Sequence, residues 1–488
     1  MAKRYSGIRE SIPERYTDLM QNSVEMEQNF KKKCLKRAER SFAQGLQCQQ
    51  INSVAAMMTI EESVMILHSP RGCSGCASTA SVSYRVSQEQ RGVKHIKNAR
   101  ILCSNLDKSN IVFGGEKKLR ETARLAVEHY QPQIVFIFTS CASGIIGEDI
   151  DLIASDLSEE YDILFVPIHC EGFKSRICAS GYDAALISIN KYLLAGERPE
   201  KKENLINLFV PTTISYADEK EMKRLLQLIG VEGNCVPFFS SLDKLKKITA
   251  ATASTSICKV FADEFMKELY QDYDIPYSHT VMPIGIRNTD KWYRGIAKVL
   301  GKEKEVEEII AAEHERIMPL VEKIRQKLQG KRVFVCGGTG RSFAAAALVN
   351  DFGMELVGLE TPTYDSDAQE DLEFLNQVNK EFIVDVAFMQ PFEQANLLQK
   401  LKPDAFLGMP DWAAKLGIPT SYLLDESKHT FGYNGLVYLG DKIMNELSNP
   451  GFNKKLGEHR KLPYKENWYE ENALKYIIGG ESNGKYCG

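Results

Sequence analysis

The fold class follows from two stretches of similar design, Val64-Met-Ile-Leu-His-Ser-Pro-Arg-Gly-Cys73 and Ile134-Val-Phe-Ile-Phe-Thr-Ser-Cys-Ala-Ser-Gly144. In each, a short apolar run ends in a turn that contains Gly and Ser, and a helix-period segment follows. The same design recurs along the chain, with strands predicted at 163–166, 205–210, 333–335, 356–359 and 405–408 and helices at 116–130 and 220–229. Strands that alternate with helices predict an α/β fold with mostly parallel sheets covered on both faces.

The length of 488 residues predicts three domains, at about 100–200 residues each. A polar break at 196–204 and a charged helical stretch at 302–332 mark the boundaries between them. We therefore predict an N-terminal extension over 1–48, α/β domains over 49–200, 201–330 and 331–462, and a polar tail over 463–488.

Composition excludes several classes of function. The 61 basic and 65 acidic residues give a net charge of −4, which argues against a nucleic acid or a membrane surface as the main partner. The first twenty residues hold no apolar run typical of a secretory signal, and no apolar stretch approaches the roughly 20 residues of a spanning helix. We expect a cytoplasmic protein, in which the 12 cysteines are buried thiols, metal ligands or reactive groups rather than disulfides.

Three cysteines are candidate metal ligands. Cys73 and Cys141 follow the two strands quoted above, at the carboxyl ends where ligands collect in parallel sheets, and Cys48 lies upstream in an irregular segment. Thiolates from three separate segments suit an iron–sulfur cluster better than zinc, because only Cys73 and Cys76 form a CxxC pair. The alternative is that all three are small core residues in turns.

We expect structural roles for several carboxylates and cysteines near these three candidate ligands. We expect Glu148, Asp149 and Asp151 to be solvated carboxylates that favour the start of a helix. Cys76 is either an extra ligand or redox thiol or, more conservatively, a packing cysteine, and we expect Cys103 to lie in the core.

A series of motifs runs along the chain from about residue 45 to about residue 460: Cys48, His68-Ser-Pro-Arg-Gly-Cys73, Asp107-Lys-Ser-Asn-Ile-Val-Phe-Gly-Gly115, Cys141-Ala-Ser-Gly-Ile-Ile-Gly-Glu-Asp149, Cys170-Glu-Gly-Phe173 and Gly432-Tyr-Asn-Gly435. In order and approximate spacing, this series resembles the α subunit of nitrogenase component 1, a family that includes the molybdenum–iron protein and nitrogenase-like reductases. The resemblance implies three Rossmann-like domains around a central cofactor cleft.

By this resemblance, Cys48, Cys73 and Cys141 hold half of an interface iron–sulfur cluster, either an eight-iron P-cluster or a four-iron 4Fe–4S cluster. A β-like homologous subunit, within an α₂β₂ heterotetramer, supplies the remaining ligands. A separate ATP-dependent iron protein delivers the electrons for reduction of a small-molecule substrate.

The resemblance also implies a complex iron–sulfur active-site cofactor, whose heterometal the sequence does not give. The motif places its cysteine at Cys258, and a shifted arginine at Arg341 is the candidate anchor. The histidine ligand of true nitrogenases should precede the Gly432 turn, but Phe431 stands there and His429 lies two residues earlier.

Two further positions depart from the nitrogenase pattern, because Cys178 and Tyr182 replace a glutamine and a histidine near the cofactor. These departures leave two functions open. The first is an oxidoreductase: nitrogenase itself, or a nitrogenase-like reductase such as one acting on methylthio-alkanes. The second is a cofactor-assembly scaffold that carries a precursor cluster.

Overall fold

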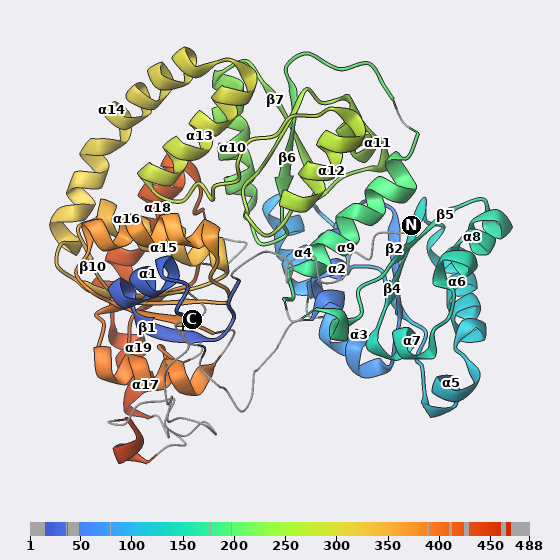
Figure 1. Cartoon of the computed structure of the whole chain (residues 1–488), viewed down its shortest axis with the longest axis horizontal. Coiled ribbons are helices and arrows are strands. Elements are labelled where there is room, and N and C mark those ends of the chain that lie inside the picture. Colours follow the sequence, from blue (N-terminus) through green and yellow to red (C-terminus); the bar gives the residue numbers. More distant parts are fainter. Residues whose placement is uncertain are drawn as a thin grey trace. The chain divides into compact units, whose positions relative to one another are not determined.

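The computed structural model describes residues 15–35, 37, 48–78, 80–175, 177–196, 198–387, 390–408, 412–423, 429–459 and 465–469. Contacts divide the chain into two compact units, one built mainly from 47–280 and the other mainly from 12–46, 281–294 and 303–488. Figure 1 shows helices flanking the sheets within each unit.

The first sheet has the strand order β3-β2-β4-β5, formed by β2 (Ser63–His68), β3 (Ile101–Cys103), β4 (Ile134–Thr139) and β5 (Leu164–Ile168). All of its strand pairs are parallel. Along β2 the side chains alternate between two cores. Val64 and Ile66 face α6 (Glu116–Tyr130) and α8 (Ile150–Tyr161), whereas Met65 and Leu67 face α2 (Gln49–Met57) and α9 (Ser180–Ser188). This confirms a parallel sheet covered on both faces (Figure 1).

The second sheet, also in the first unit, has the order β7-β6-β8 and is parallel throughout. Its strands are β6 (Leu205–Val210), β7 (Glu232–Pro237) and β8 (Ala253–Ser256). The helices α10 (Tyr216–Leu228), α11 (Leu242–Lys246) and α12 (Asp263–Tyr273) accompany it. Phe209 of β6 packs edge-on against Phe265 of α12, with ring centroids 5.2 Å apart. Cys258 follows β8 by two residues.

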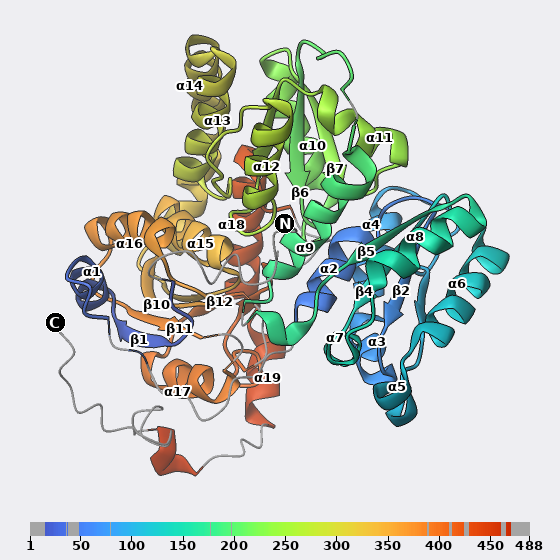
Figure 2. The same cartoon turned by 45° about the vertical axis from the view of Figure 1, so that its right-hand side comes forward.

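The second unit holds a six-stranded sheet of order β1-β11-β10-β9-β12-β13 (Figure 2). Its strands are β1 (Leu19–Asn22), β9 (Arg332–Cys336), β10 (Glu355–Thr361), β11 (Ile383–Val386), β12 (Ala405–Leu407) and β13 (Thr420–Ser421). The helices around it include α1 (Ser23–Lys31), α14 (Glu303–Leu328), α15 (Thr339–Asp351), α16 (Ser366–Val378), α17 (Pro391–Leu401), α18 (Gly432–Ser448) and α19 (Gly451–Glu458). Every pair is parallel except β1 with β11.

The predicted mixed α/β class with mostly parallel sheets is confirmed, and the helix predicted at 116–130 coincides with α6. The N-terminal segment differs from the expectation of a plain extension, because β1 joins the sheet of the second unit. The domain boundaries remain a prediction.

Of the predicted tail, residues 465–469 are described, and Trp468 and Tyr469 pack against Ala395 of α17. Among the described helices, none is both long and apolar enough to cross a bilayer.

Candidate functional site

The three predicted cluster cysteines lie at the starts of helices around the first sheet. Cys48 directly precedes α2, Cys73 lies in the first turn of α3 (Arg71–Ser78), and Cys141 opens α7 (Cys141–Ile146). The strands β2 and β4 end just before α3 and α7, so Cys73 and Cys141 stand at the carboxyl edge of a parallel sheet. Cys48 and Cys141 are exposed and Cys73 is half-buried.

Gly172 brings two of these segments close together. It opens a short 3-10 turn after β5, and a Cβ built on it would lie 3.2 Å from the Cβ of Cys48 and 3.4 Å from the Sγ of Cys141. The same point is 3.8 Å from the Sγ of Cys48, so the two sulfurs are at most about 7 Å apart. A side chain here would fill the space between the thiols, which explains why the position is glycine.

Cys73 belongs to the same group of thiols. Burial raises the pKa of Cys73, and the sulfurs of Cys48 and Cys141, followed by those of Cys76 and Cys103, raise it further. A neighbouring thiolate has this effect because two like charges disfavour each other at short range. The ends of β2 and β4, His68 and Thr139, lie opposite each other, and α2 packs against α3, so the structure brings Cys48, Cys73 and Cys141 into one neighbourhood.

The donor set fits an iron–sulfur cluster better than a single ion. Within the described ranges, no three His, Cys, Asp or Glu side chains converge on one point closely enough to hold a lone metal. Zinc would require such convergence, with each sulfur about 2.3 Å from the ion. In an iron–sulfur cluster each thiolate binds its own iron, so the sulfurs stand farther apart.

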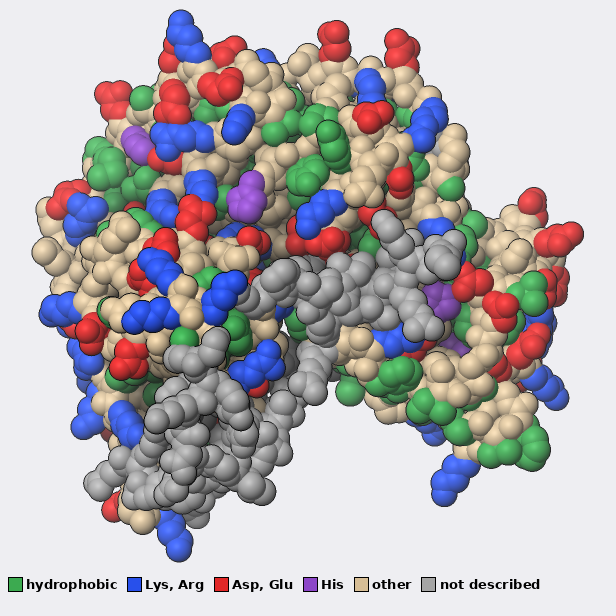
Figure 3. Space-filling model, in the orientation of Figure 1, with side chains coloured by type: hydrophobic (Ala, Val, Ile, Leu, Met, Phe, Trp, Pro, Cys, Tyr) green, Lys and Arg blue, Asp and Glu red, His purple; other side chains and the backbone are tan. Residues whose placement is uncertain are grey.

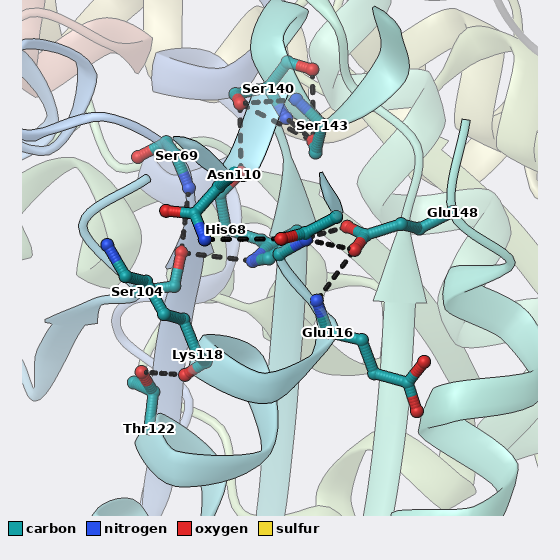
Figure 4. A network of polar contacts seen from close by, with 12 residues as sticks. His68, Ser69, Ser104, Asn110, Glu116, Lys118, Thr122, Ser140, Ser143 and Glu148 are labelled. Carbon is teal, nitrogen blue, oxygen red and sulfur yellow. Dashed lines mark hydrogen bonds and ion pairs between the residues drawn. The ribbon is translucent and has the colours of Figure 1, made fainter. Parts of the chain in front are cut away.

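A buried hydrogen-bond network ties the two cysteine-bearing turns together (Figure 4). His68 ends β2, and its Nε2 lies 2.8 Å from Oε2 of Glu148 while its Nδ1 lies 3.0 Å from Oγ of Ser104. Because a carboxylate only accepts, Nε2 carries the proton and Ser104 donates to Nδ1. Burial lowers the pKa of His68, which favours this neutral form. The Oγ of Ser140, next to Cys141, donates to the carbonyl of His68 at 2.8 Å.

Glu148 differs from the predicted solvated carboxylate. Its side chain is only 11% exposed, and Oε1 also accepts the backbone N–H groups of Gly115 and of Glu116, the latter at 2.6 Å. The sequence contained no sign of this role, because Gly115 and Glu148 are far apart along the chain. Asp149 does cap α8, accepting from the N–H of Leu152 at 3.0 Å.

Cys76 and Cys103, the other two cysteines of this region, differ in their burial. Cys76 lies on α3 and is exposed, so the conservative expectation of a packing cysteine is wrong. Cys103 ends β3 and is half-buried rather than fully in the core. Its thiol donates to the carbonyl of Ser69 at 3.3 Å, which anchors the turn that precedes α3.

The predicted cofactor cysteine, Cys258, is half-buried at the carboxyl end of β8. Its backbone N–H donates to Oγ of Ser256 at 3.3 Å. Cys258 and Tyr182 pack against the same core, and the Tyr182 ring meets Phe261 at 5.0 Å between centroids. Cys178 hydrogen-bonds Asn52 of α2, and burial raises the pKa of its thiol.

The remaining cofactor candidates lie in the second unit. Arg341, on α15, is buried and donates to the carbonyl of Leu423 at 2.7 Å. Its guanidinium also lies 5.2 Å from the ring centroid of Phe431, the residue that stands where the resemblance predicts a histidine. His429 is half-buried, and its ring lies 6.2 Å from that of Tyr438. The structure thus pairs Arg341 with Phe431, and the roles of Arg341, His429 and Cys258 stay predictions.

An apolar surface surrounds the cysteine turns. Phe113 of α5 (Lys108–Phe113) is 87% exposed, and Val112, Ile145 of α7 and Phe173 are exposed too. The helices α5 and α7 pack side by side, and Figure 3 shows hydrophobic side chains gathered over them. Exposed apolar side chains gathered in this way are typical of surfaces that associate with another protein.

Comparison with known proteins identifies the family of this chain. The family model for nitrogenase component 1 type oxidoreductases matches residues 48–448. The nitrogenase molybdenum-iron protein alpha chain of Methanosarcina barkeri is 26% identical over 61% of this chain, and the match spans 56% of that relative. The nitrogenase iron-molybdenum cofactor biosynthesis protein NifE of the same organism is 25% identical over 83% of this chain and 88% of the relative.

The solved structure Nitrogenase Cp1 at pH 5 has the same fold, with a TM-score of 0.70 at 23% identity over 88% of this chain and 91% of that one. The matched range begins at Cys48 and includes Cys73, Cys141 and Cys258. The chain belongs to the nitrogenase component 1 type oxidoreductases.

Proposed function

We propose that this chain is the α-like subunit of a nitrogenase-type oxidoreductase and that Cys48, Cys73 and Cys141 hold an iron–sulfur cluster. The observation that carries the proposal is the close approach of Cys48 and Cys141 on either side of Gly172, with Cys73 at the end of the neighbouring strand of the same sheet. When bound, such a cluster supplies one-electron transfer. The electrons would come from an ATP-dependent iron protein.

The chain's own residues would prepare this site in two ways. The network through His68 and Glu148 fixes the turns that carry Cys73 and Cys141, which holds the donor atoms in place before metal binds. Gly172 keeps the space between Cys48 and Cys141 open.

The exposed apolar surface around Phe113 and Ile145 would pack against a β-like homologous subunit, as in an α₂β₂ assembly. Burying this surface on association would also exclude water from the cluster, which strengthens electrostatic interactions there. A cytoplasmic location fits the same proposal.

Cys258 would attach a second iron–sulfur cofactor at which a small-molecule substrate is reduced. It stands at the carboxyl end of a parallel strand, where α/β proteins bind ligands. Phe431 occupies the position of the expected histidine, so we place the activity with nitrogenase-like reductases, such as those acting on methylthio-alkanes, ahead of nitrogenase itself.

A second candidate function, a cofactor-assembly scaffold, is favoured by the stacking of Arg341 on Phe431. With Phe431 in place of the expected histidine, the chain would hold a cofactor through fewer ligands, which suits a scaffold that passes its cluster on. Relatives named as cofactor biosynthesis proteins align over most of this chain, which supports the same candidate.

Two variants test the cluster assignment in protein purified without oxygen. Cys141→Ala should lose the interface iron and weaken association with the β-like subunit, whereas Cys34→Ala, which removes a thiol of the second unit, should change neither. Unchanged iron and unchanged assembly in Cys141→Ala would refute the assignment.

Turnover separates the two candidate functions. Supplied with ATP and an iron protein, a reductase forms product over many cycles, and Cys258→Ala abolishes product while the interface iron remains. A scaffold instead transfers its cluster once to an apo-protein and forms no product.

A further inference from the structure

The fourth thiol of the cysteine group, Cys76, is on the same helix as Cys73 and three residues after it. Residues with this spacing share a helix face, with their Cβ atoms about 5–6 Å apart. Cys76 is exposed, so it is a thiol that the fold does not use for core packing.

The surface of α3 beside these two cysteines is open. A Cβ on Gly72 or on Gly75 would meet no other atom within 4 Å among those described, so nothing in that part of the chain covers this side of the helix. Both glycines have helical backbone rather than left-handed angles, so no turn geometry demands them. Their small size leaves room beside Cys73 and Cys76.

The thiols of this neighbourhood divide into two kinds. Cys48, Cys73, Cys76 and Cys141 lie at helix starts or on a helix surface and are exposed or half-exposed. Cys103 also influences Cys73, but it ends a strand and donates its S–H to the carbonyl of Ser69. Cys103 therefore has a structural role at a strand end, whereas the other four cysteines share a position at a helix start or on a helix surface.

We propose that Cys76 is the fourth ligand and that this chain alone supplies all four thiolates of a four-iron, four-sulfur cluster. The proposal rests on the function proposed above and deepens it, because it selects a four-iron cluster over an eight-iron one. It also frees the β-like subunit from contributing a cysteine. Four cysteines complete the coordination of such a cluster, one at each iron, and C-x₂-C spacing is established in iron–sulfur proteins. Each thiol releases its proton to solvent as it binds iron.

The experiment uses the full chain, expressed without its partner, purified without oxygen and loaded with sulfide and with equal amounts of ferrous and ferric iron, the two oxidation states that a four-iron cluster combines. We expect about four irons and four sulfides per chain. Cys76→Ala should lose at least half of the iron, whereas the control Cys34→Ala, which removes a thiol of the second unit, keeps it. Because Cys76 is exposed, its replacement should leave the melting temperature of the iron-free chain unchanged.

A second measurement needs no variant. In the loaded chain, iodoacetamide should spare Cys76 together with Cys48, Cys73 and Cys141, and removal of iron by a chelator should expose all four to alkylation. Cys34, in the second unit, should react equally in both states.

Three results would overturn the proposal: alkylation of Cys76 at the same rate with and without iron, full iron in Cys76→Ala, or binding of zinc alone. The Cys141→Ala variant, measured alongside, distinguishes failure of the fourth ligand from failure of the whole cluster assignment. If it loses iron while Cys76→Ala keeps it, only the fourth ligand is wrong. If both keep their iron, the proposed function fails as well.

Discussion

A single methyl group placed on Gly172 tests whether the space between the thiols holds the metal. In Gly172→Ala the new Cβ would lie 3.2 Å from the Cβ of Cys48 and 3.4 Å from the Sγ of Cys141. Carbon atoms pack best at about 3.5–4.0 Å, so the crowding amounts to a few tenths of an ångström. Gly172 has no left-handed φ, and alanine can therefore adopt its backbone.

The expected cost to folding is small. Cys48 is exposed and can yield, so the variant should lose about 1 kcal/mol, at the lower end of what overpacking costs. For a unit of this size, that lowers the melting temperature by about 2–4 °C. The bound metal cannot move away in the same manner as the Cys48 side chain, because the methyl group stands between two of its ligands. We expect the iron content to fall at least twofold.

The assay measures iron per chain by mass spectrometry and the melting temperature on the same anaerobic sample. Gly451→Ala is the matched control, since a Cβ there would meet nothing within 4 Å. Iron equal to that of the unsubstituted chain, in a folded Gly172→Ala protein, would refute the reasoning.

Three further predictions concern the network, the second unit and the partner surface. Glu148→Ala leaves His68 and two backbone N–H groups without their acceptor, so the free energy of unfolding in urea should fall by about 2–4 kcal/mol, and a loss under about 0.5 kcal/mol would contradict the role given to this carboxylate. Burial raises the pKa of Asp351 to about 7. Between about pH 4 and pH 7 the folded chain therefore binds more protons than the unfolded chain. The free energy of unfolding falls as the pH rises through that window. Asp351→Asn should therefore gain about 2–3 kcal/mol relative to the unsubstituted protein between pH 5 and pH 8, and a difference independent of pH would show that the carboxyl titrates normally. Phe113→Asp should weaken association with the co-expressed β-like subunit at least tenfold, as judged by gel filtration, while Phe452→Asp, also largely exposed but on the second unit, should not.

The sequence was informative where chemistry and periodicity coincide. Apolar runs before Gly- and Ser-containing turns located β2 and β4, and the rule that ligands collect at the carboxyl ends of parallel strands selected Cys73 and Cys141. Strands that are buried on both faces are apolar throughout, without the alternating polar residues of a half-exposed strand, so they are easy to recognise in a sequence.

Features that depend on long-range contacts were not predictable in the same way. The strand β1 was missed because Leu19-Met-Gln-Asn22 is short and half polar, and it forms only by pairing with β11. Gly172 and Glu148 act through residues far away in the chain. Nothing in a single sequence shows which distant segment will stand beside them.

The central claim, that Cys48, Cys73 and Cys141 bind iron together, is tested most directly by X-ray anomalous scattering. Data would be collected on both sides of the iron absorption edge from crystals grown without oxygen. The account predicts a compact anomalous peak bordered by these three sulfurs and by Gly172. A map with no iron signal among them, or with the iron bound elsewhere in the chain, would contradict it.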